Sequence, residues 1–159
     1  MIGVKFITLG TLKESYLREA AAEYEKRLSA FCRFEMIQLK EEKLSDNPGA
    51  SEIRNALERE AAMIEKQIPP RAYRVAMCVE GVQKSSEELA AHLERVADQH
   101  GDICFIIGSS YGLADSVKAS SHLRLSVSKL TFPHQLMRVL LLEAVYRAFN
   151  ISKGTKYHK

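Results

Sequence analysis

Apolar residues in this chain gather in short runs that alternate with longer stretches where they recur every three or four positions. The runs are rich in β-branched and aromatic residues and are bounded by glycine, proline or polar residues, which is typical of buried strands. They predict strands at residues 2–9, 34–39, 75–79, 103–107 and 123–127. The longer stretches predict helices at residues 12–30, 51–67 and 87–99, a short helix ending near Ser120, and a long final helix.

Strand and helix therefore alternate along the whole length. This alternation predicts an α/β domain with a mostly parallel sheet and helices on both faces. Ser51 is a candidate N-cap for the second helix, and Ser85 or Ser86 for the third. The polar stretch 40–50, which contains Asp-Asn-Pro-Gly, predicts a loop that is too short to divide two domains. We expect residues 1–159 to form a single domain.

The longest pattern runs from Leu125 to Phe149, LSVSKLTFPHQLMRVLLLEAVYRAF, and predicts a short strand, a polar loop and an apolar helix. Pro133 suits the first helical position, and Thr131 just upstream is a candidate cap. One broad helical face carries Met137, Leu140, Leu141, Ala144, Val145 and Ala148, whereas Leu136, Val139 and Leu142 fall outside it. A helix that is apolar nearly all round is usually buried on more than one side, so we expect a second subunit to cover it.

Composition is that of an ordinary globular protein, with 46% hydrophobic and 27% charged residues. No window approaches the roughly 20 apolar residues of a membrane span. The N-terminal MIGVKFITLG lacks the long apolar region and cleavage site of a signal peptide, so we expect a cytoplasmic protein.

The cysteines Cys32, Cys78 and Cys104 are widely spaced and have no metal-ligand pattern, which predicts reduced, buried thiols.

Charge is distributed unevenly along the chain. From Arg124 to the end there are seven lysines and arginines against one acid, a net charge of +6, so the rest of the chain carries −3 of the +3 total. A cationic end on a neutral-to-acidic body suggests a polyanionic partner. Chance clustering at a solvated terminus is the alternative.

Parallel sheets bind ligands beyond the carboxyl ends of their strands. Three such ends stand out, at residues 77–81, 107–113 and 127–134. The second, IGSSYGL, is neither a Walker A loop nor a GxGxxG fingerprint, and it also suits a plain strand-to-helix turn that needs glycine. Because the first strand lacks a GxGxxG turn as well, a nucleotide-dependent oxidoreductase is disfavoured.

Two further groups carry candidate chemistry. His134 and Arg138 lie four apart near a helix start, where a cationic pair attracts phosphate or carboxylate, although a partly exposed surface pair has the same spacing. Glu143 and Arg147, also four apart, predict a local ion pair. The terminal KGTKYHK reads as a frayed tail, yet it holds a stacking group, an imidazole and three cations.

Taken together, FIIGSSYGL, the Leu125–Phe149 stretch and the terminal YHK resemble the RlmH family of SPOUT-superfamily methyltransferases, which methylate N3 of a pseudouridine in 23S ribosomal RNA. The resemblance covers the full length, and its motifs are concentrated after Met77. It implies a deep trefoil knot in the C-terminal part and a homodimer. It also implies S-adenosylmethionine as the methyl donor, held by the knot loops, and no metal.

The resemblance assigns roles to residues of this chain. The implied cofactor contacts are Met77, Gly108, Val127, Ser128, Lys129, Leu130, Thr131 and Phe132. Since N3–H of a pseudouridine is a weak acid, the enzyme must accept that proton while it aligns N3 with the methyl group. His158 is the first candidate for this task and His134 the second. The implied groups that position the nucleotide by charge and stacking are Arg138, Tyr157 and Lys159.

The expected partner is 23S ribosomal RNA within the ribosome or large subunit, and neither DNA nor a membrane. With +6 at one end only, the chain should bind bare RNA weakly and need a structured target and a dimer. Two other functions stay open at this point. One is a SPOUT methyltransferase acting on another RNA atom, such as a ribose 2′-OH, and the other is a non-catalytic ribosome assembly factor.

Overall fold

The computed structural model describes residues 1–159, in which strands and helices alternate as the hydrophobic pattern predicts. The strands are β1 (Gly3–Leu9), β2 (Arg33–Leu39), β3 (Tyr73–Val82), β4 (Asp102–Ile107) and β5 (Leu123–Leu125). The helices are α1 (Ser15–Leu28), α2 (Ala50–Glu65), α3 (Ser86–Ala97), α4 (Asp115–Ser120) and α5 (His134–Ser152).

The five strands form one sheet in the order β2-β1-β4-β3-β5, and every neighbouring pair is parallel. In the central β4, the whole run from Ile103 to Ile107 is buried. Such uninterrupted burial is expected when helices cover both faces of a parallel sheet. The predicted α/β class is confirmed.

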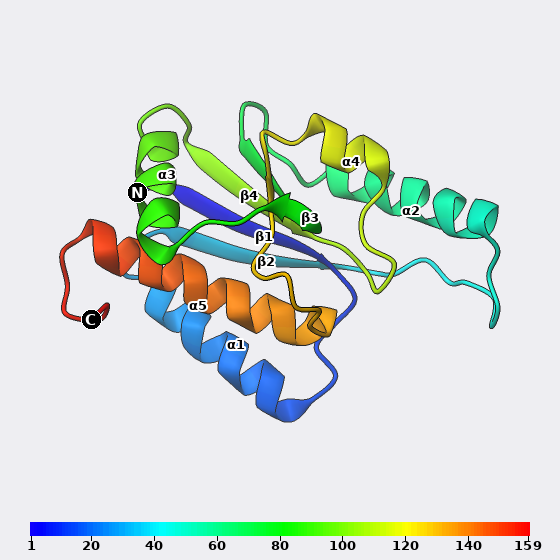
Figure 1. Ribbon diagram of the computed structural model, residues 1–159, viewed down its shortest axis with the longest axis horizontal. Coiled ribbons are helices and arrows are strands. Elements are labelled where there is room, and N and C mark those ends of the chain that lie inside the picture. The colour runs from blue at the N-terminus through cyan, green and yellow to red at the C-terminus, as the bar shows by residue number, and fades with distance from the viewer.

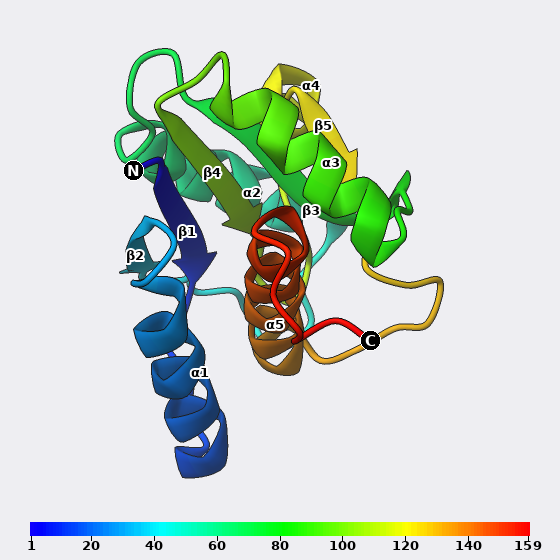
Figure 2. The ribbon, with the colours of Figure 1, turned by 90° about the vertical axis from the view of Figure 1, so that its left-hand side faces the viewer.

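Helices α1, α3 and α5 cover one face of the sheet, and α2 and α4 cover the other (Figures 1 and 2). Side chains of β4 alternate between the two layers: Phe105 packs with the first group of helices, and Cys104 and Ile106 with the second. Each fully buried large apolar side chain stabilises such a core by roughly 1.5–3 kcal/mol.

None of the helices combines the length and hydrophobicity that a membrane crossing requires.

Helix α5 lies between α1 and α3 (Figure 2). Leu141, Val145 and Ala148 of the predicted face are buried, and so is Leu142, which lies outside that face and which we expected a second subunit to cover. Leu142 is buried because α5 contacts the sheet and two flanking helices at once. Pro133 occupies the N-cap rather than the first helical position, and no side chain caps the helix, so the predicted Thr131 cap is wrong.

One predicted helix cap is confirmed and another is wrong. Ser85 caps α3 in a capping box with Glu88. Ser51 does not cap α2, which begins at Ala50 after Gly49. Strand β3 is longer than predicted because its pairing with β5 resumes at Val82 after a register shift. The trefoil knot that the family resemblance implies stays a prediction.

Candidate active site

A cavity of about 470 Å³ opens at the carboxyl ends of β3, β4 and β5. Its walls come from residues 77–80, 107–113, 125–128 and 130–134, with Lys118 and Met137 added from α4 and α5. The three strand ends that the sequence singles out therefore meet at one site. A cavity of this size suits a small organic ligand or a nucleoside.

The glycine turn after β4 brings backbone close to this cavity. The N–H of Gly112 donates to the carbonyl oxygen of Ser109 at 2.8 Å, and Gly112 has a φ of +85°, which favours glycine. A Cβ on Gly108 would overlap the backbone carbonyl of Gly112. Glycine is thus required by the turn itself, and both glycines line the cavity.

The loop between β5 and α5 is held by its own hydroxyl groups. The buried Ser126 donates from N–H to the carbonyl of Val82 at 2.9 Å and from its hydroxyl to the carbonyl of Ser128 at 3.0 Å. The Ser128 hydroxyl in turn accepts from the N–H of Leu130 at 3.0 Å. Such local bonds hold a short loop without regular structure.

Seven of the eight residues predicted to contact the cofactor line the cavity. They are Met77, Gly108, Val127, Ser128, Leu130, Thr131 and Phe132, whereas Lys129 does not. The cavity wall also carries an ion pair that the sequence did not predict, in which Lys118 Nζ lies 2.7 Å from the Glu80 carboxylate. That hydrogen bond from Lys118 holds the pKa of the Glu80 carboxyl below its usual range. Nothing in the local pattern around Lys118 indicates its partner, because α4 and β3 meet only in the fold.

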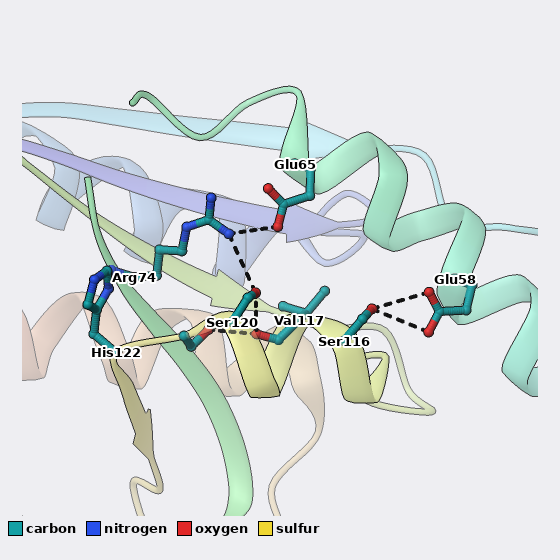
Figure 3. Close-up of polar contacts among 8 residues, drawn as sticks. Glu58, Glu65, Arg74, Ser116, Val117, Ser120 and His122 are labelled. Carbon is teal, nitrogen blue, oxygen red and sulfur yellow. Dashed lines mark hydrogen bonds and ion pairs between the residues drawn. The ribbon is translucent and has the colours of Figure 1, made fainter. Parts of the chain in front are cut away.

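Helix α4, which follows the glycine turn, is anchored by polar contacts (Figure 3). Ser116 donates to the Glu58 carboxylate of α2 at 3.2 Å. Arg74 of β3 reaches Glu65 of α2 at 2.7 Å and the hydroxyl of Ser120 at 3.5 Å. These contacts hold the helix that carries Lys118 against α2 and β3.

A buried carboxyl group supports the other side of the turn. Glu60 of α2 is 4% exposed and accepts from the N–H of Glu42 at 3.0 Å and from the Ser109 hydroxyl at 3.4 Å. Burial raises the pKa of the Glu60 carboxyl. Glu60 thereby links the glycine turn to the loop after β2. The pattern of residues in this helix did not predict that role.

His134 and Arg138 differ sharply in environment. His134 lines the cavity, with Nε2 at 3.7 Å from the Glu41 carboxylate. Arg138 is 1% exposed and donates to the carbonyl oxygens of Leu9 at 3.4 Å and Gly10 at 3.1 Å. The alternative of an exposed surface pair is therefore wrong for Arg138. Its guanidinium lies at the end of β1, outside the cavity lining, and burial lowers its pKa.

We expect Arg138→Met to lower the free energy of unfolding by about 2–4 kcal/mol, because two carbonyl groups lose a buried donor. Urea denaturation would measure the change. The matched control is Arg54→Met, an exposed arginine of α2 for which we expect a change within about 0.5 kcal/mol. An unchanged or higher stability of the Arg138 variant would contradict this prediction. It would show that burying the guanidinium charge costs at least as much free energy as its hydrogen bonds contribute.

The C-terminal tail is docked rather than frayed. Tyr157 donates from its hydroxyl to Glu143 at 2.7 Å, and the Arg147 guanidinium lies 4.7 Å from the centre of the Tyr157 ring. The predicted ion pair between Glu143 and Arg147 is confirmed at 2.7 Å. His158 contacts Arg147 and also Glu87 of α3, whereas Lys159 is exposed.

Within one chain the tail and the cavity lie far apart. Residues at the start of α5 line the cavity, and the tail follows the other end of this helix. Figure 1 shows the tail at the end of α5 that lies away from the loop between β5 and α5. Since α5 has 19 residues, its two ends are separated by about 28 Å. His134 and His158 are therefore not brought together within one chain.

The model of a family described as "Predicted SPOUT methyltransferase" matches residues 2–158. The chain belongs to the SPOUT methyltransferase family. Among its SPOUT relatives are proteins named "Ribosomal RNA large subunit methyltransferase H". The one from Leuconostoc mesenteroides is 43% identical over 99% of this chain and 100% of the relative. Those from Streptococcus thermophilus and Caldicellulosiruptor saccharolyticus are 46% and 47% identical, over 98% of this chain and 99% of each relative. The resemblance to the RlmH family is confirmed.

Solved structures support the SPOUT fold. A probable methyltransferase from Bordetella pertussis matches with a TM-score of 0.56 and 15% identity, over 92% of this chain and 95% of that one. A probable methylase family protein from Haemophilus influenzae matches with a TM-score of 0.52 and 15% identity, over 98% of this chain and 70% of that one. At this identity the likeness concerns the fold alone.

Proposed function

We propose that this chain transfers a methyl group from S-adenosylmethionine to N3 of a pseudouridine in 23S ribosomal RNA of the large ribosomal subunit, in the cytoplasm. The observation that carries the proposal is the cavity at the strand ends, built from the three segments that hold the family motifs. The full-length relatives named as large-subunit ribosomal RNA methyltransferases support the substrate class.

The residues of the cavity fit S-adenosylmethionine, which supplies an electrophilic methyl group when bound. Gly108 and Gly112 both line the cavity, so the turn that they form presents backbone groups rather than side chains to a ligand. Apolar side chains such as Met77, Leu130 and Phe132 would cover the flat adenine ring. No cluster of three or more His, Cys, Asp or Glu side chains is placed to hold a metal ion.

The protein's own groups would handle the N3 proton and hold the nucleotide. In this proposal His158 accepts the proton, and His134, on the cavity wall, is the second candidate. Tyr157 and Lys159 position the nucleotide by stacking and charge. Arg138 acts indirectly, since its guanidinium fixes the start of α5, where His134 lies, against the end of β1.

A homodimer would complete this site. Because tail and cavity lie at opposite ends of α5, we propose that the tail of one subunit serves the cavity of its partner. Several apolar side chains around the cavity are exposed in the single chain, and a second copy would cover them. They are Val79, Tyr111, Val127 and Leu130.

Two measurements test the function. Calorimetry should show S-adenosylmethionine binding to the purified protein, which a non-catalytic assembly factor would lack. Nucleoside analysis after incubation with S-adenosylmethionine should find N3-methylpseudouridine in the RNA of ribosomes or large subunits, and much less in a naked hairpin of the same sequence. A methyl group on a ribose 2′-oxygen would favour the other SPOUT chemistry. Binding without any methyl transfer would overturn the proposal.

A further inference from the structure

Both ring nitrogens of His158 have a partner, and the two partners differ in kind. Nε2 lies 2.8 Å from a carboxylate oxygen of Glu87, and Nδ1 lies 3.3 Å from a guanidinium nitrogen of Arg147. A carboxylate only accepts hydrogen bonds, so Nε2 carries the hydrogen. A guanidinium only donates, so Nδ1 presents its lone pair. These contacts select the neutral imidazole in a single tautomer.

We propose that Glu87 is a positioning residue for His158, holding its ring in the tautomer whose Nδ1 accepts the N3 proton of the pseudouridine. This inference rests on the proposed function. In the step, the proton moves from N3 to Nδ1, and the resulting imidazolium keeps its Nε2–H on Glu87. The N3 electron pair forms the bond to the methyl carbon, and the pair of the broken carbon–sulfur bond stays on sulfur as a thioether. No further reactant is required.

Arg147 does not block this role. Its guanidinium is held by Glu143 through contacts of 2.7 and 2.8 Å, which are shorter than its 3.3 Å approach to Nδ1. A substrate N–H can therefore replace Arg147 at Nδ1 while the arginine keeps its ion pair. Two tyrosine hydroxyl groups also lie beside this cluster. That of Tyr157 is bound to Glu143, and that of Tyr24 in α1 faces both Glu143 and Tyr157.

The charges around His158 favour the imidazolium that proton transfer creates. Glu143 offsets the positive charge of Arg147, which leaves the Glu87 carboxylate to face Nε2–H. The hydrogen bond from His158 lowers the pKa of the Glu87 carboxyl, so Glu87 is ionised at neutral pH. Glu87 lies in the first turn of α3, where the helix dipole also favours an anion.

The fold fixes the place of Glu87. The capping box defines the start of α3 by two hydrogen bonds between Ser85 and Glu88, of 2.7 and 3.1 Å. Glu87 lies between these two residues in the chain, so its backbone is held in place. The Glu87 side chain is 64% exposed, and solvent screening limits the strength of a contact at such a site. A moderate effect on rate is therefore expected, rather than loss of activity.

The test compares Glu87→Gln and Glu87→Ala with Glu94→Gln, a control at an exposed glutamate of the same helix. Single-turnover methylation is measured at neutral pH over a range of ribosome concentrations. Glutamine keeps an acceptor but loses the charge, so the maximal rate should fall about threefold to tenfold. The ribosome concentration that gives half the maximal rate should stay unchanged, because Glu87 acts on His158 and not on binding. Alanine should cost more, and the control should match the wild type.

Further outcomes separate this inference from the function beneath it. An unaltered maximal rate in both Glu87 variants, with His158→Ala inactive, would overturn the role of Glu87 alone. A lower rate that comes with weaker ribosome binding would assign Glu87 a merely structural role and overturn it too. Full activity of His158→Ala would overturn the base assignment together with this inference. In the double variant Glu87→Ala/His158→Ala, no loss beyond that of His158→Ala is expected.

Discussion

Replacing His158 by alanine is expected to lower the single-turnover rate of methylation by about 100-fold or more, the usual effect of removing a general base. The pseudouridine N3 becomes a good nucleophile only when its proton leaves, and alanine cannot accept that proton. Binding of S-adenosylmethionine should be unchanged, because the residues that would hold the cofactor come from the cavity lining of a single chain, which does not include His158. The rate is measured with saturating cofactor and ribosomes, so that chemistry rather than binding is observed.

A second histidine serves as the matched control. His100 lies between α3 and β4 and contacts the carbonyl oxygen of Arg71. It precedes the amino end of β4, whereas the cavity lies at the carboxyl ends of the strands. His100→Ala should methylate ribosomes at the wild-type rate. If His158→Ala reacted as fast as this control, His134 would become the first candidate for the proton acceptor.

Replacing Gly108 by alanine is expected to weaken S-adenosylmethionine binding by about 10- to 100-fold, the equivalent of 1–3 kcal/mol of local strain. The added Cβ would overlap the carbonyl group of Gly112. A backbone carbonyl within a closed turn cannot rotate away as a side chain can, so the wall of the cavity must shift. Calorimetry gives the affinity, and thermal unfolding shows whether the variant is folded.

The control for this variant is Gly101→Ala, since a Cβ at Gly101 would meet no atom within 4 Å. Its cofactor affinity should equal that of the wild type. Wild-type affinity in Gly108→Ala would show that the glycine turn is no part of the cofactor site, even though it lines the cavity.

The two variants together test whether the site is shared between subunits. In a mixed dimer of Gly108→Ala and His158→Ala, one subunit keeps an intact tail and the other an intact cavity. If the tail serves the partner's cavity, one complete site forms and activity returns to about half the wild-type value, because one site of two is restored. If each tail served its own cavity, the mixed dimer would stay inactive.

Local pattern was enough to predict most of the architecture. The strand at Ile103–Ile107 was predicted because every side chain of a central parallel strand is buried, which leaves an uninterrupted apolar run. Ser85 or Ser86 was predicted as a cap because a serine just before a helical pattern is a short-range signal, and the structure selects Ser85, whose partner Glu88 lies three residues further on. The three strand ends were predicted to meet because parallel strands place their carboxyl ends at one edge.

Features that depend on distant groups were not predicted. Arg138 was predicted to join His134 in a cationic pair that attracts phosphate. It is buried instead, because carbonyl oxygens of Leu9 and Gly10, more than 120 residues away in the chain, accept its hydrogen bonds. The pairing of Lys118 with Glu80 and the burial of Leu142 likewise depend on which elements become neighbours. A charge or a leucine has no local signature of its eventual partner.

The sequence by itself determined the order and type of the elements, the edge of the sheet that carries the site and, through its motifs, the family. Those properties follow from side-chain periodicity and short-range spacing. The tertiary structure alone decided that the start of α5 closes the cavity while its end carries the tail to Glu87 of α3. The reason is physical: a helix of 19 residues is too long for both ends to serve one site, so the docking of α5 between α1 and α3 sets which groups can react together.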